Sequence, residues 1–298
     1  SMMLYGTIST GTRSGGINRP LPGASGATVS WDPEQLLVYE VGFNSAFDLG
    51  QFPARANGAV FYYDYEDKVL QGLVTVDCST PNNPTPCTVN HVQNQNAAKA
   101  ELFGVEIDGD ILFNWGFNLK WNVAYLDSEF KSGSVVVDSR QPPVQVDLGG
   151  NQLPNTSEWN AMLSLSQNRD TEFGSFDWTI SATYRSEFYL SPYNSKGYDA
   201  DGNPAPLEDL AVNNHWLIMG AGFPAANGNF MSDHVPSTTV WNFNIGANMG
   251  DEEEFRVEAW WSNFTDETYS GKAFINDSVN IRFLNPPSMW GVRAMYRW

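Results

Sequence analysis

Two cysteines, Cys78 and Cys87, are the residues in this chain whose spacing most directly suggests a covalent role. They flank a segment rich in proline, asparagine and threonine, which indicates a loop. In an exported protein such a pair favours a disulfide, worth about 2–3 kcal/mol from loop closure, with free thiols as the alternative. A zinc site is disfavoured, because His91 is the only other ligand nearby and structural zinc needs a full tetrahedral set.

Three oxygen-bearing residues, Asp199, Asp201 and Asn203, copy the start of a calcium-binding loop. The position that should then carry a bidentate carboxylate is occupied by Leu210. The three residues are therefore weak metal candidates, and a solvated acidic loop is the simpler interpretation. We expect no cofactor.

The three histidines, His91, His215 and His234, all lie in segments that we expect to be loops. His215 with Asp209, or His234 with Asp233, would supply a general base and its orienting acid. Some ten-stranded outer-membrane barrels are proteases with such residues at the rim, but nothing else resembling their residues occurs here in order. An enzyme is therefore the least favoured function.

The charge balance of the chain excludes a nucleic-acid partner. The 298 residues include 34 acidic and 16 basic side chains, for a formal net charge of −18, whereas phosphate neutralisation needs clustered Lys and Arg. With 42% hydrophobic and 14% aromatic residues, disorder is excluded as well. No run approaches the roughly 18 apolar residues of a membrane-spanning helix. No secretory signal opens the chain, so an exported protein would be a processed or truncated chain.

Hydrophobic residues recur with a period of two, which is typical of strands with one apolar and one polar face. In residues 59–65 we assign Ala59, Phe61, Tyr63 and Tyr65 to the apolar face. The segment 4–10 has the weakest pattern. All the alternating segments together predict about ten strands. They are 4–10, 37–44, 59–65, 103–111, 117–125, 159–165, 176–184, 241–249, 255–262 and 290–298.

The connections between these segments alternate between long and short. The long loops are expected at 11–33, 67–99, 131–155, 190–236 and 265–288, and the tight turns at 48–53, 113–116, 168–174 and 250–253. Loops above about 12–15 residues are uncommon in compact soluble domains, whereas outer-membrane barrels combine short periplasmic turns with long extracellular loops. We therefore predict an all-β fold, an antiparallel up-and-down transmembrane β-barrel in the bacterial outer membrane. A soluble all-β protein is the alternative.

In a membrane barrel the apolar face of each strand meets lipid and the polar face lines the interior. The side chains that would face the lumen could tune selectivity, but the simpler interpretation is hydrogen bonding within the wall and toward a plug. These lumen-facing candidates are Lys120, Arg185, Asn242, Asn244, Arg256, Glu258 and Arg293.

Several segments, in order along the chain, resemble the TonB-dependent outer-membrane receptors. Tyr5 to Asn18, Pro33 to Gly42, Ala59 to Tyr65 and Phe103 to Glu106 resemble consecutive barrel strands of that family. Asn263-Phe-Thr-Asp-Glu-Thr-Tyr269 resembles its Asn-Leu-Thr-Asp-x-x-Tyr motif before the last loop. The final aromatic residues, Tyr296 and Trp298, resemble the C-terminal signal read by the barrel-assembly machinery.

The resemblance implies a receptor that imports a scarce nutrient, of the siderophore-iron, vitamin or glycan class, with energy from the TonB complex. Large receptors of this kind close with about 22 strands around a plugged lumen, and nothing here resembles a plug domain or TonB box. We therefore expect residues 1–298 to be the C-terminal portion of a larger barrel. The expected partners are outer-membrane lipid, the barrel-assembly machinery, the TonB complex through a plug domain missing from this chain, and an unidentified small molecule. A complete small barrel, or a surface ligand-binding β module without transport, is the alternative.

Overall fold

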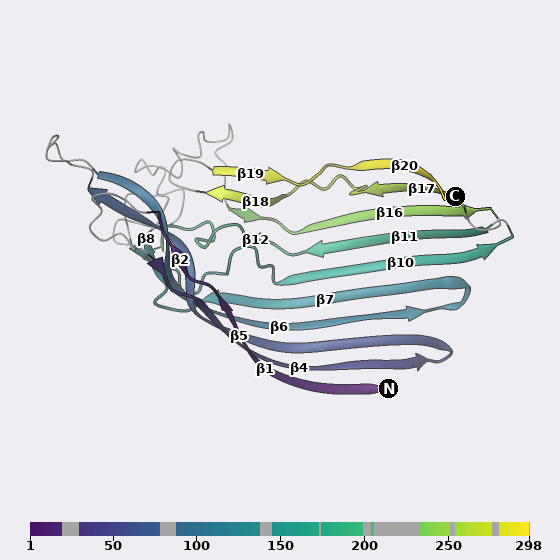
Figure 1. Ribbon diagram of the computed structural model, residues 1–298, viewed down its shortest axis with the longest axis horizontal. Coiled ribbons are helices and arrows are strands. Elements are labelled where there is room, and N and C mark those ends of the chain that lie inside the picture. The colour runs from purple at the N-terminus through teal and green to yellow at the C-terminus, as the bar shows by residue number, and fades with distance from the viewer. Residues whose placement is uncertain are drawn as a thin grey trace.

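One antiparallel sheet dominates the computed structural model, which describes residues 1–19, 30–77, 88–137, 145–172, 174–198, 204–205, 233–250, 254–275 and 280–297. Figure 1 shows its strands side by side, with β1 at one edge and β20 at the other. In order across the sheet they are β1 (Met2–Arg13), β4 (Glu34–Leu49), β5 (Phe52–Asp77), β6 (Thr88–Leu112), β7 (Phe117–Phe130), β10 (Trp159–Thr171), β11 (Gly174–Arg185), β16 (Thr238–Met249), β17 (Phe255–Ser262) and β20 (Met289–Tyr296). The predicted all-β, up-and-down arrangement is confirmed.

Shorter elements connect these strands. The 3₁₀ turn η1 (Asn114–Gly116) joins β6 to β7. Five two-stranded pairs occur in the described ranges: β2 (Gly16–Ile17) with β3 (Ser30–Trp31), β8 (Val135–Val137) with β9 (Gln145–Asp147), β12 (Phe188–Tyr189) with β15 (His234–Val235), β13 (Gly197–Tyr198) with β14 (Pro204–Ala205), and β18 (Ser270–Ile275) with β19 (Asn280–Leu284). No helix in the part of the chain that the structure describes is long and apolar enough to cross a membrane.

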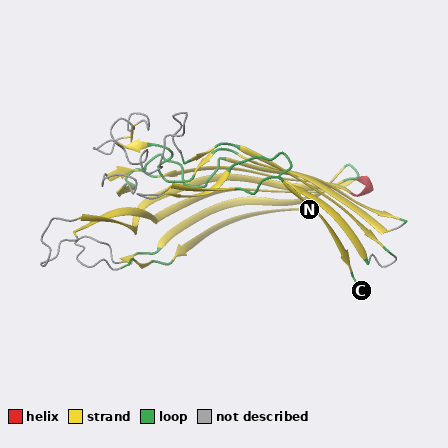
Figure 2. Ribbon diagram, turned by 90° about the horizontal axis from the view of Figure 1, so that it is seen from above, coloured by secondary structure: helices red, strands yellow, loops and turns green. Residues whose placement is uncertain are grey.

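Short and long connections alternate between the two ends of the sheet, as the sequence predicts. The short turns gather at one end of the strands, on the right in Figure 1, and the long connections gather at the opposite end. Seen from above in Figure 2, the sheet is curved and the small strand pairs lie at the end with the long connections. We call these two ends the turn end and the loop end.

Register places apolar side chains in rows across the sheet, because directly opposed residues on neighbouring strands share a face. One row joins six strands and consists of Leu119, Leu165, Ile180, Phe243, Trp261 and Trp290. A second row consists of Val41, Val60, Val105, Tyr125 and Trp159. We call this side of the sheet the apolar face.

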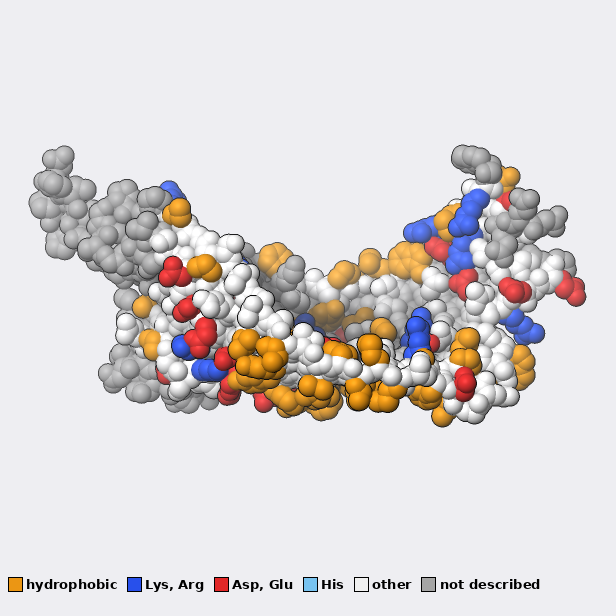
Figure 3. All heavy atoms as spheres, turned by 60° about the horizontal axis from the view of Figure 1, so that its bottom comes forward, with side chains coloured by type: hydrophobic (Ala, Val, Ile, Leu, Met, Phe, Trp, Pro, Cys, Tyr) orange, Lys and Arg blue, Asp and Glu red, His pale blue; other side chains and the backbone are white. Residues whose placement is uncertain are grey.

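Much of the apolar face is exposed rather than packed against other protein. Val41 is 67% exposed and Trp290 73% exposed, and Figure 3 shows hydrophobic side chains gathered over the middle of the molecule. Exposed apolar surface this extensive is rare on soluble monomers. It fits a sheet whose outer solvent is hydrocarbon.

A small protein core lies on the other side of the sheet, at the loop end. Phe130, Ala98 and Ala100 project from β7 and β6 and pack against Val146 and Leu148 of the β8–β9 hairpin. Phe130 is 1% exposed and Leu148 is fully buried. Because Ala100 opposes Phe130 in register and both lie opposite to the apolar face, the hairpin folds over the polar face.

Two details of the predicted strands are wrong. Most of the predicted loop at 67–99 is strand, since β5 continues to Asp77 and β6 begins at Thr88. The four residues assigned to the apolar face of 59–65 belong to the polar face, because Phe61 opposes Gly104, and Arg55 on the same face opposes Asp110. They are Ala59, Phe61, Tyr63 and Tyr65. The predicted alternation held there, but the aromatic residues are on the opposite side, where Phe61 is 8% exposed.

The turn that contains Asn263 fixes the loop end of β17. Asn263 has a φ of 50°, in the left-handed region that asparagine tolerates. Its side-chain Nδ2 donates to the carbonyl oxygens of Glu267 at 2.9 Å and Pro286 at 3.3 Å, and its Oδ1 accepts from the Glu267 amide at 2.9 Å. This asparagine therefore ties the end of β17 to the segment that enters β20.

Candidate functional site

The seven predicted lumen residues all lie on one face of the sheet. Lys120, Ser164, Ser181, Asn242 and Ser262 form a continuous row of opposed positions on five strands. Asn244, Arg256, Glu258, Arg185 and Arg293 belong to the same face by register. We call this side, which includes the row and these residues, the polar face.

Arg256 organises the charged part of the polar face near the turn end. Its guanidinium donates to both carboxylate oxygens of Asp177, at 2.7 and 3.2 Å, and to Asn248 Oδ1 at 3.2 Å. Its Nε donates to Glu258 at 3.2 Å, and Glu258 also pairs with Arg293 at 3.2 Å. Bidentate Arg–carboxylate pairs are among the stronger ionic contacts. These contacts lock β11, β16, β17 and β20 together at this level.

Arg185 and Asn242 are also held by wall contacts. Arg185 donates to the Ser157 hydroxyl and to the Asn155 carbonyl, and its guanidinium lies 3.6 Å from the centre of the Phe188 ring. Asn242 Oδ1 accepts from the Ser262 hydroxyl at 3.2 Å and from the Asn263 amide at 3.0 Å. The arrangement indicates that both residues hold the wall and its loop-end turns.

Lys120 and Asn244 differ from the other candidates. Neither side chain makes a hydrogen bond or ion pair with another residue that the structure describes, and Lys120 is exposed. Lys120 opposes Asp110 on one side and Ser164 on the other. These two side chains are therefore the predicted candidates with donors still available on the polar face.

Sequence reasoning missed an acidic stretch of the polar face on β5 and β6. Arg55 donates to Asp110 at 2.7 Å, and Asn57 donates to Asp108 at 2.9 Å. It also missed Asp177, the main partner of Arg256. The signal was present, because Asp177 alternates with Phe176 and Trp178 and so had to lie on the polar face.

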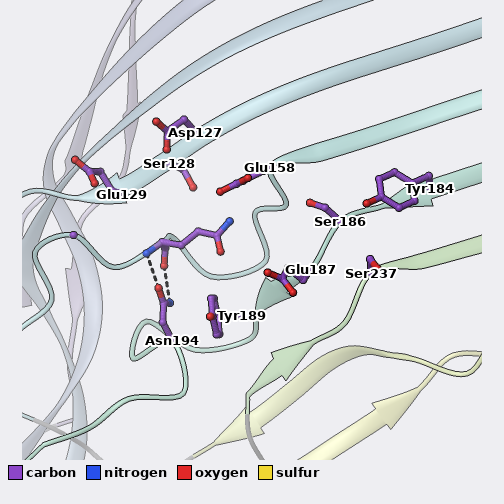
Figure 4. A pocket seen from close by; sticks show the side chains of 12 residues that line it. Asp127, Ser128, Glu129, Glu158, Tyr184, Ser186, Glu187, Tyr189, Asn194 and Ser237 are labelled. Carbon is purple, nitrogen blue, oxygen red and sulfur yellow. Dashed lines mark hydrogen bonds between the residues drawn. The ribbon is translucent and has the colours of Figure 1, made fainter. Parts of the chain in front are cut away.

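A cavity of about 570 Å³ lies at the loop end, beside the part of β7 that extends past the start of β10. Figure 4 shows the carboxylates of Asp127, Glu129, Glu158 and Glu187 around it. Asn194 closes one side, with Oδ1 accepting from the Gln152 amide at 2.6 Å and Nδ2 donating to the Gln152 carbonyl at 2.9 Å. Among the residues that the structure describes, no Lys or Arg lines this cavity, which we call the loop-end cavity.

Just beyond the end of β7, Lys131 binds acidic residues of the two preceding strands. Its Nζ lies 2.7 Å from Asp64 Oδ1 and 3.5 Å from Glu101 Oε2. The hydrogen bond to Asp64 raises the pKa of the Lys131 ammonium above its usual value. Lys131 therefore stays charged across the physiological range, and this pairing marks the loop-end border of the apolar face.

Of the two enzymatic pairings considered above, His215 with Asp209 lies outside the described residues, and only His234 and Asp233 are described. His234 Nε2 lies 3.1 Å from Glu187 Oε2, whereas the carboxylate of Asp233 accepts hydrogen bonds from Ser191 and Ser195. His91 lies in β6 and not in a loop. Among the described residues, no group of three or more His, Cys, Asp or Glu side chains could hold a metal ion.

Several predicted residues lie outside the described part of the chain. They are Cys78, Cys87, Asp199, Asp201, Asn203, Asp209, His215 and Trp298. Tyr296, the other residue of the C-terminal signal, lies on the apolar face and stacks on Phe255 with ring centres 5.3 Å apart.

A curved antiparallel sheet with an exposed apolar face, a polar opposite face and long connections at one end defines an outer-membrane β-barrel wall. The sequence matches the family described as TonB dependent receptor-like, beta-barrel, over residues 1–264, and the chain belongs to this family. Proteins of this family are bacterial outer-membrane proteins. No curated protein matches the sequence.

Two bacterial receptors are among the solved structures that share this fold. The ferric yersiniabactin uptake receptor FyuA from Yersinia pestis is 16% identical, with a TM-score of 0.64 over 99% of this chain and 35% of that receptor. The siderophore receptor PiuA from Acinetobacter baumannii is 15% identical, with a TM-score of 0.60 over 98% of this chain and 33% of that receptor. The chain thus spans about a third of the length of these receptors, and the likeness concerns the fold.

Proposed function

We propose that residues 1–298 form the C-terminal part of the barrel wall of a TonB-dependent transporter for a scarce nutrient. The observation that carries the proposal is the separation of the two faces. The row from Lys120 to Ser262 carries only amine, hydroxyl and amide groups, and the neighbouring row from Leu119 to Trp290 is apolar throughout. A wall of this kind separates lipid from a polar passage.

The polar face offers two kinds of side chain to a passing ligand or to a plug. Arg256, Glu258 and Arg293 are engaged in the wall and would keep the passage rigid. Lys120 and Asn244 have donors that remain available, so we propose them as the residues most able to contact a ligand or a plug domain.

Energy coupling would need a plug domain and a TonB box, and no segment of this chain resembles either. In our proposal a plug domain elsewhere in the protein closes the passage and binds the TonB complex. Tyr296 and Trp298 would be read by the barrel-assembly machinery during insertion, and the exposed apolar face would be covered by outer-membrane lipid.

For the nutrient we propose siderophore-bound iron ahead of a vitamin or a glycan. The support is an analogy of fold, since the solved structures named above are a ferric yersiniabactin uptake receptor and a siderophore receptor. The many carboxylates of the loop-end cavity would suit a ligand with cationic or hydroxyl groups better than an anionic one.

The test is energised uptake by the complete protein in living cells. A strain lacking the gene is supplied with a panel of radiolabelled iron–siderophores, a corrinoid and oligosaccharides, in the presence and absence of TonB. We expect accumulation of at least one iron–siderophore that requires both the gene and TonB. Binding without accumulation in either background would contradict transport.

The loop-end cavity supports one second candidate, a surface ligand-binding module without transport. Its polar lining could hold a ligand at the cell surface, and such binding needs no transport step. Under this alternative the same cells retain the ligand at the surface equally with and without TonB, and Lys120→Ala has no effect on the retained amount. A TonB-dependent accumulation lowered by Lys120→Ala favours transport instead.

A further inference from the structure

One tryptophan stands on the polar side of the sheet among hydroxyl and amide groups. Trp260 in β17 directly opposes Asn244 in β16 and Gly291 in β20. It is the one aromatic residue on the polar face of the described strands β10, β11, β16, β17 and β20, because register places their other aromatic residues on the apolar face. Contact with lipid therefore does not explain an aromatic ring at this position.

Gly291 determines where the indole ring of Trp260 lies. A Cβ atom at Gly291 would be 2.7 Å from Cζ2, 2.8 Å from Cε2 and 3.0 Å from Nε1 of the ring. The ring thus lies directly against the glycine backbone, in space that any larger residue would need for its own side chain. The Trp260 side chain is still partly exposed on the polar face.

The side chains beside the ring are neutral and rich in hydrogen-bonding groups. Asn244 and Thr179 continue the row that contains Trp260, and Asn242 and Ser262 belong to the next row toward the loop end. Amide and hydroxyl side chains both donate and accept hydrogen bonds. Within the described ranges, the side chains of Trp260, Asn244 and Thr179 make no hydrogen bond to another residue. Their polar groups are therefore available to a ligand.

The charges nearest to Trp260 compensate one another. Glu258, two positions earlier on the same face, pairs with Arg256 at 3.2 Å and with Arg293 at 3.2 Å. Lys120, the cation with available donors, lies in β7, four strands from β17 and hence roughly 20 Å away at the usual strand spacing. The surroundings of the ring therefore favour a neutral ligand over an anionic one.

Trp260 lies close to the loop end, because β17 ends two residues later at Ser262. In an outer-membrane barrel this end faces the outside of the cell, so an entering ligand meets this part of the polar face early. A sugar ring has an apolar side made of C–H groups and an edge of hydroxyl groups. An aromatic ring flanked by neutral amide and hydroxyl groups is complementary to both.

We propose that Trp260, Asn244 and Thr179 form a binding site for a neutral sugar ring near the outer mouth of the passage, and that Gly291 is the residue that positions the indole. The ring of Trp260 stacks on the C–H side of the sugar, while Asn244 and Thr179 bind its hydroxyl groups. The inference rests on the proposed transport function and names the chemistry of the ligand, either a free glycan or a sugar carried by an iron chelate.

The test is direct binding of the complete protein, in a detergent without a sugar headgroup, to an array of neutral oligosaccharides. We expect the parent protein to bind at least one of them. Trp260→Ala should weaken this binding about tenfold, the effect of losing an aromatic stacking contact. If no oligosaccharide binds, or if Trp260→Ala binds as well as the parent, the proposal is wrong. Should Trp260→Ala not fold, Asn244→Ala takes its place, and unchanged binding by that variant contradicts the site equally.

Gly291→Ala tests the positioning role without removing the indole. The emission of Trp260, obtained as the difference between proteins with and without Trp260→Phe, should shift when the bound oligosaccharide is added. We expect this shift to be lost in Gly291→Ala, together with most of the binding. The matched control is Gly271→Ala, since a Cβ there would meet no atom within 4 Å, and it should behave as the parent. An unaltered shift in Gly291→Ala would remove Gly291 from the proposal.

A second comparison distinguishes the two sources of the sugar. A ferric catecholate chelate is offered to the protein with and without the sugar that the array identifies. Tighter binding of the sugar-bearing chelate, reversed by Trp260→Ala, assigns the site to an iron carrier. Equal binding of the two chelates, with oligosaccharide binding retained, assigns it to a free glycan.

The sugar site and the transport function can fail separately. TonB-dependent accumulation that Trp260→Ala leaves unchanged, in a protein that binds no oligosaccharide, would overturn only the sugar site. Oligosaccharide binding that depends on Trp260, without TonB-dependent accumulation of any ligand, would overturn transport and leave the site in place.

Discussion

Asn263 shows how a single side chain can replace several backbone contacts. Its amide group makes three hydrogen bonds to the backbone of Glu267 and Pro286, and it is 3% exposed. Buried backbone groups left without a partner cost free energy, so this residue has to be both polar and tolerant of a positive φ. Few residues other than asparagine meet both requirements.

Asn263→Ala should lower the free energy of unfolding by about 2–4 kcal/mol, because it leaves buried backbone groups unpaired and places alanine at a positive φ. Asn263→Gly relieves the strain of the positive φ but does not restore the lost hydrogen bonds. It should therefore lower the free energy of unfolding by less than Asn263→Ala does. The measurement is urea unfolding of the complete protein in vesicles. A larger loss for glycine than for alanine would mean that the φ requirement is not what selects asparagine.

Arg256 should be the most costly charged residue of the polar face to remove. Arg256→Ala leaves Asp177 without its bidentate partner. The side chains of Arg256 and Asp177 are only 20% and 30% exposed, so we expect the free energy of unfolding to fall by about 2–3 kcal/mol. The matched control is Arg293→Ala, which removes a 62% exposed partner of the same Glu258 and should cost less than about 1 kcal/mol. Equal losses in urea unfolding would argue against the central role of Arg256.

At the scale of elements, the β8–β9 hairpin should be stabilised by its own core. Phe130→Ala empties the space against Val146 and Leu148, and such truncations cost about 3–5 kcal/mol. Local stability need not be shared by the whole sheet. We therefore expect faster hydrogen exchange at the amides of β8 and β9 in this variant, with β16 and β17 unchanged. Faster exchange in all four strands would show that hairpin and sheet unfold together.

The strands themselves could be predicted where one face meets lipid, since alternation there is enforced by the solvent. The prediction from alternation failed in the loop-end half of β5 and β6, where residues 93–96 are Gln-Asn-Gln-Asn. Outside the bilayer neither face needs to be apolar, so the period-two signal disappears. The wrong face for Phe61 has a related cause, because an aromatic residue on the polar face can still be buried, here against Gly104.

The contacts of the polar face could be predicted only in part. Alternation identifies which face carries Arg256 and Lys120, but not which of them is engaged. That depends on the register of β16 with both β11 and β17, which brings Asp177 next to Arg256 from 79 positions away. The same limit applies to the loop-end cavity, whose lining comes from four separate segments.

At the scale of the whole molecule, the account depends on which side of the sheet meets hydrocarbon. The chain belongs to a family of outer-membrane barrels and spans about a third of the receptors that share its fold. Its two edge strands, β1 and β20, are not paired with each other in the described residues. In our proposal, further strands of a larger barrel pair with both edges, because a strand in hydrocarbon cannot leave its edge unpaired.

The most direct test compares arginine on adjacent residues at the centre of β10. Leu165 opposes Leu119 and Ile180 on the apolar face, while Ser166 opposes Asn118 and Thr179 on the polar face. We measure the free energy of unfolding of the complete protein folded into vesicles. Leu165→Arg should lower it by about 2–4 kcal/mol, and Ser166→Arg by less than about 1 kcal/mol. The opposite order, with arginine tolerated at Leu165 and not at Ser166, would contradict the assignment of the apolar face to lipid.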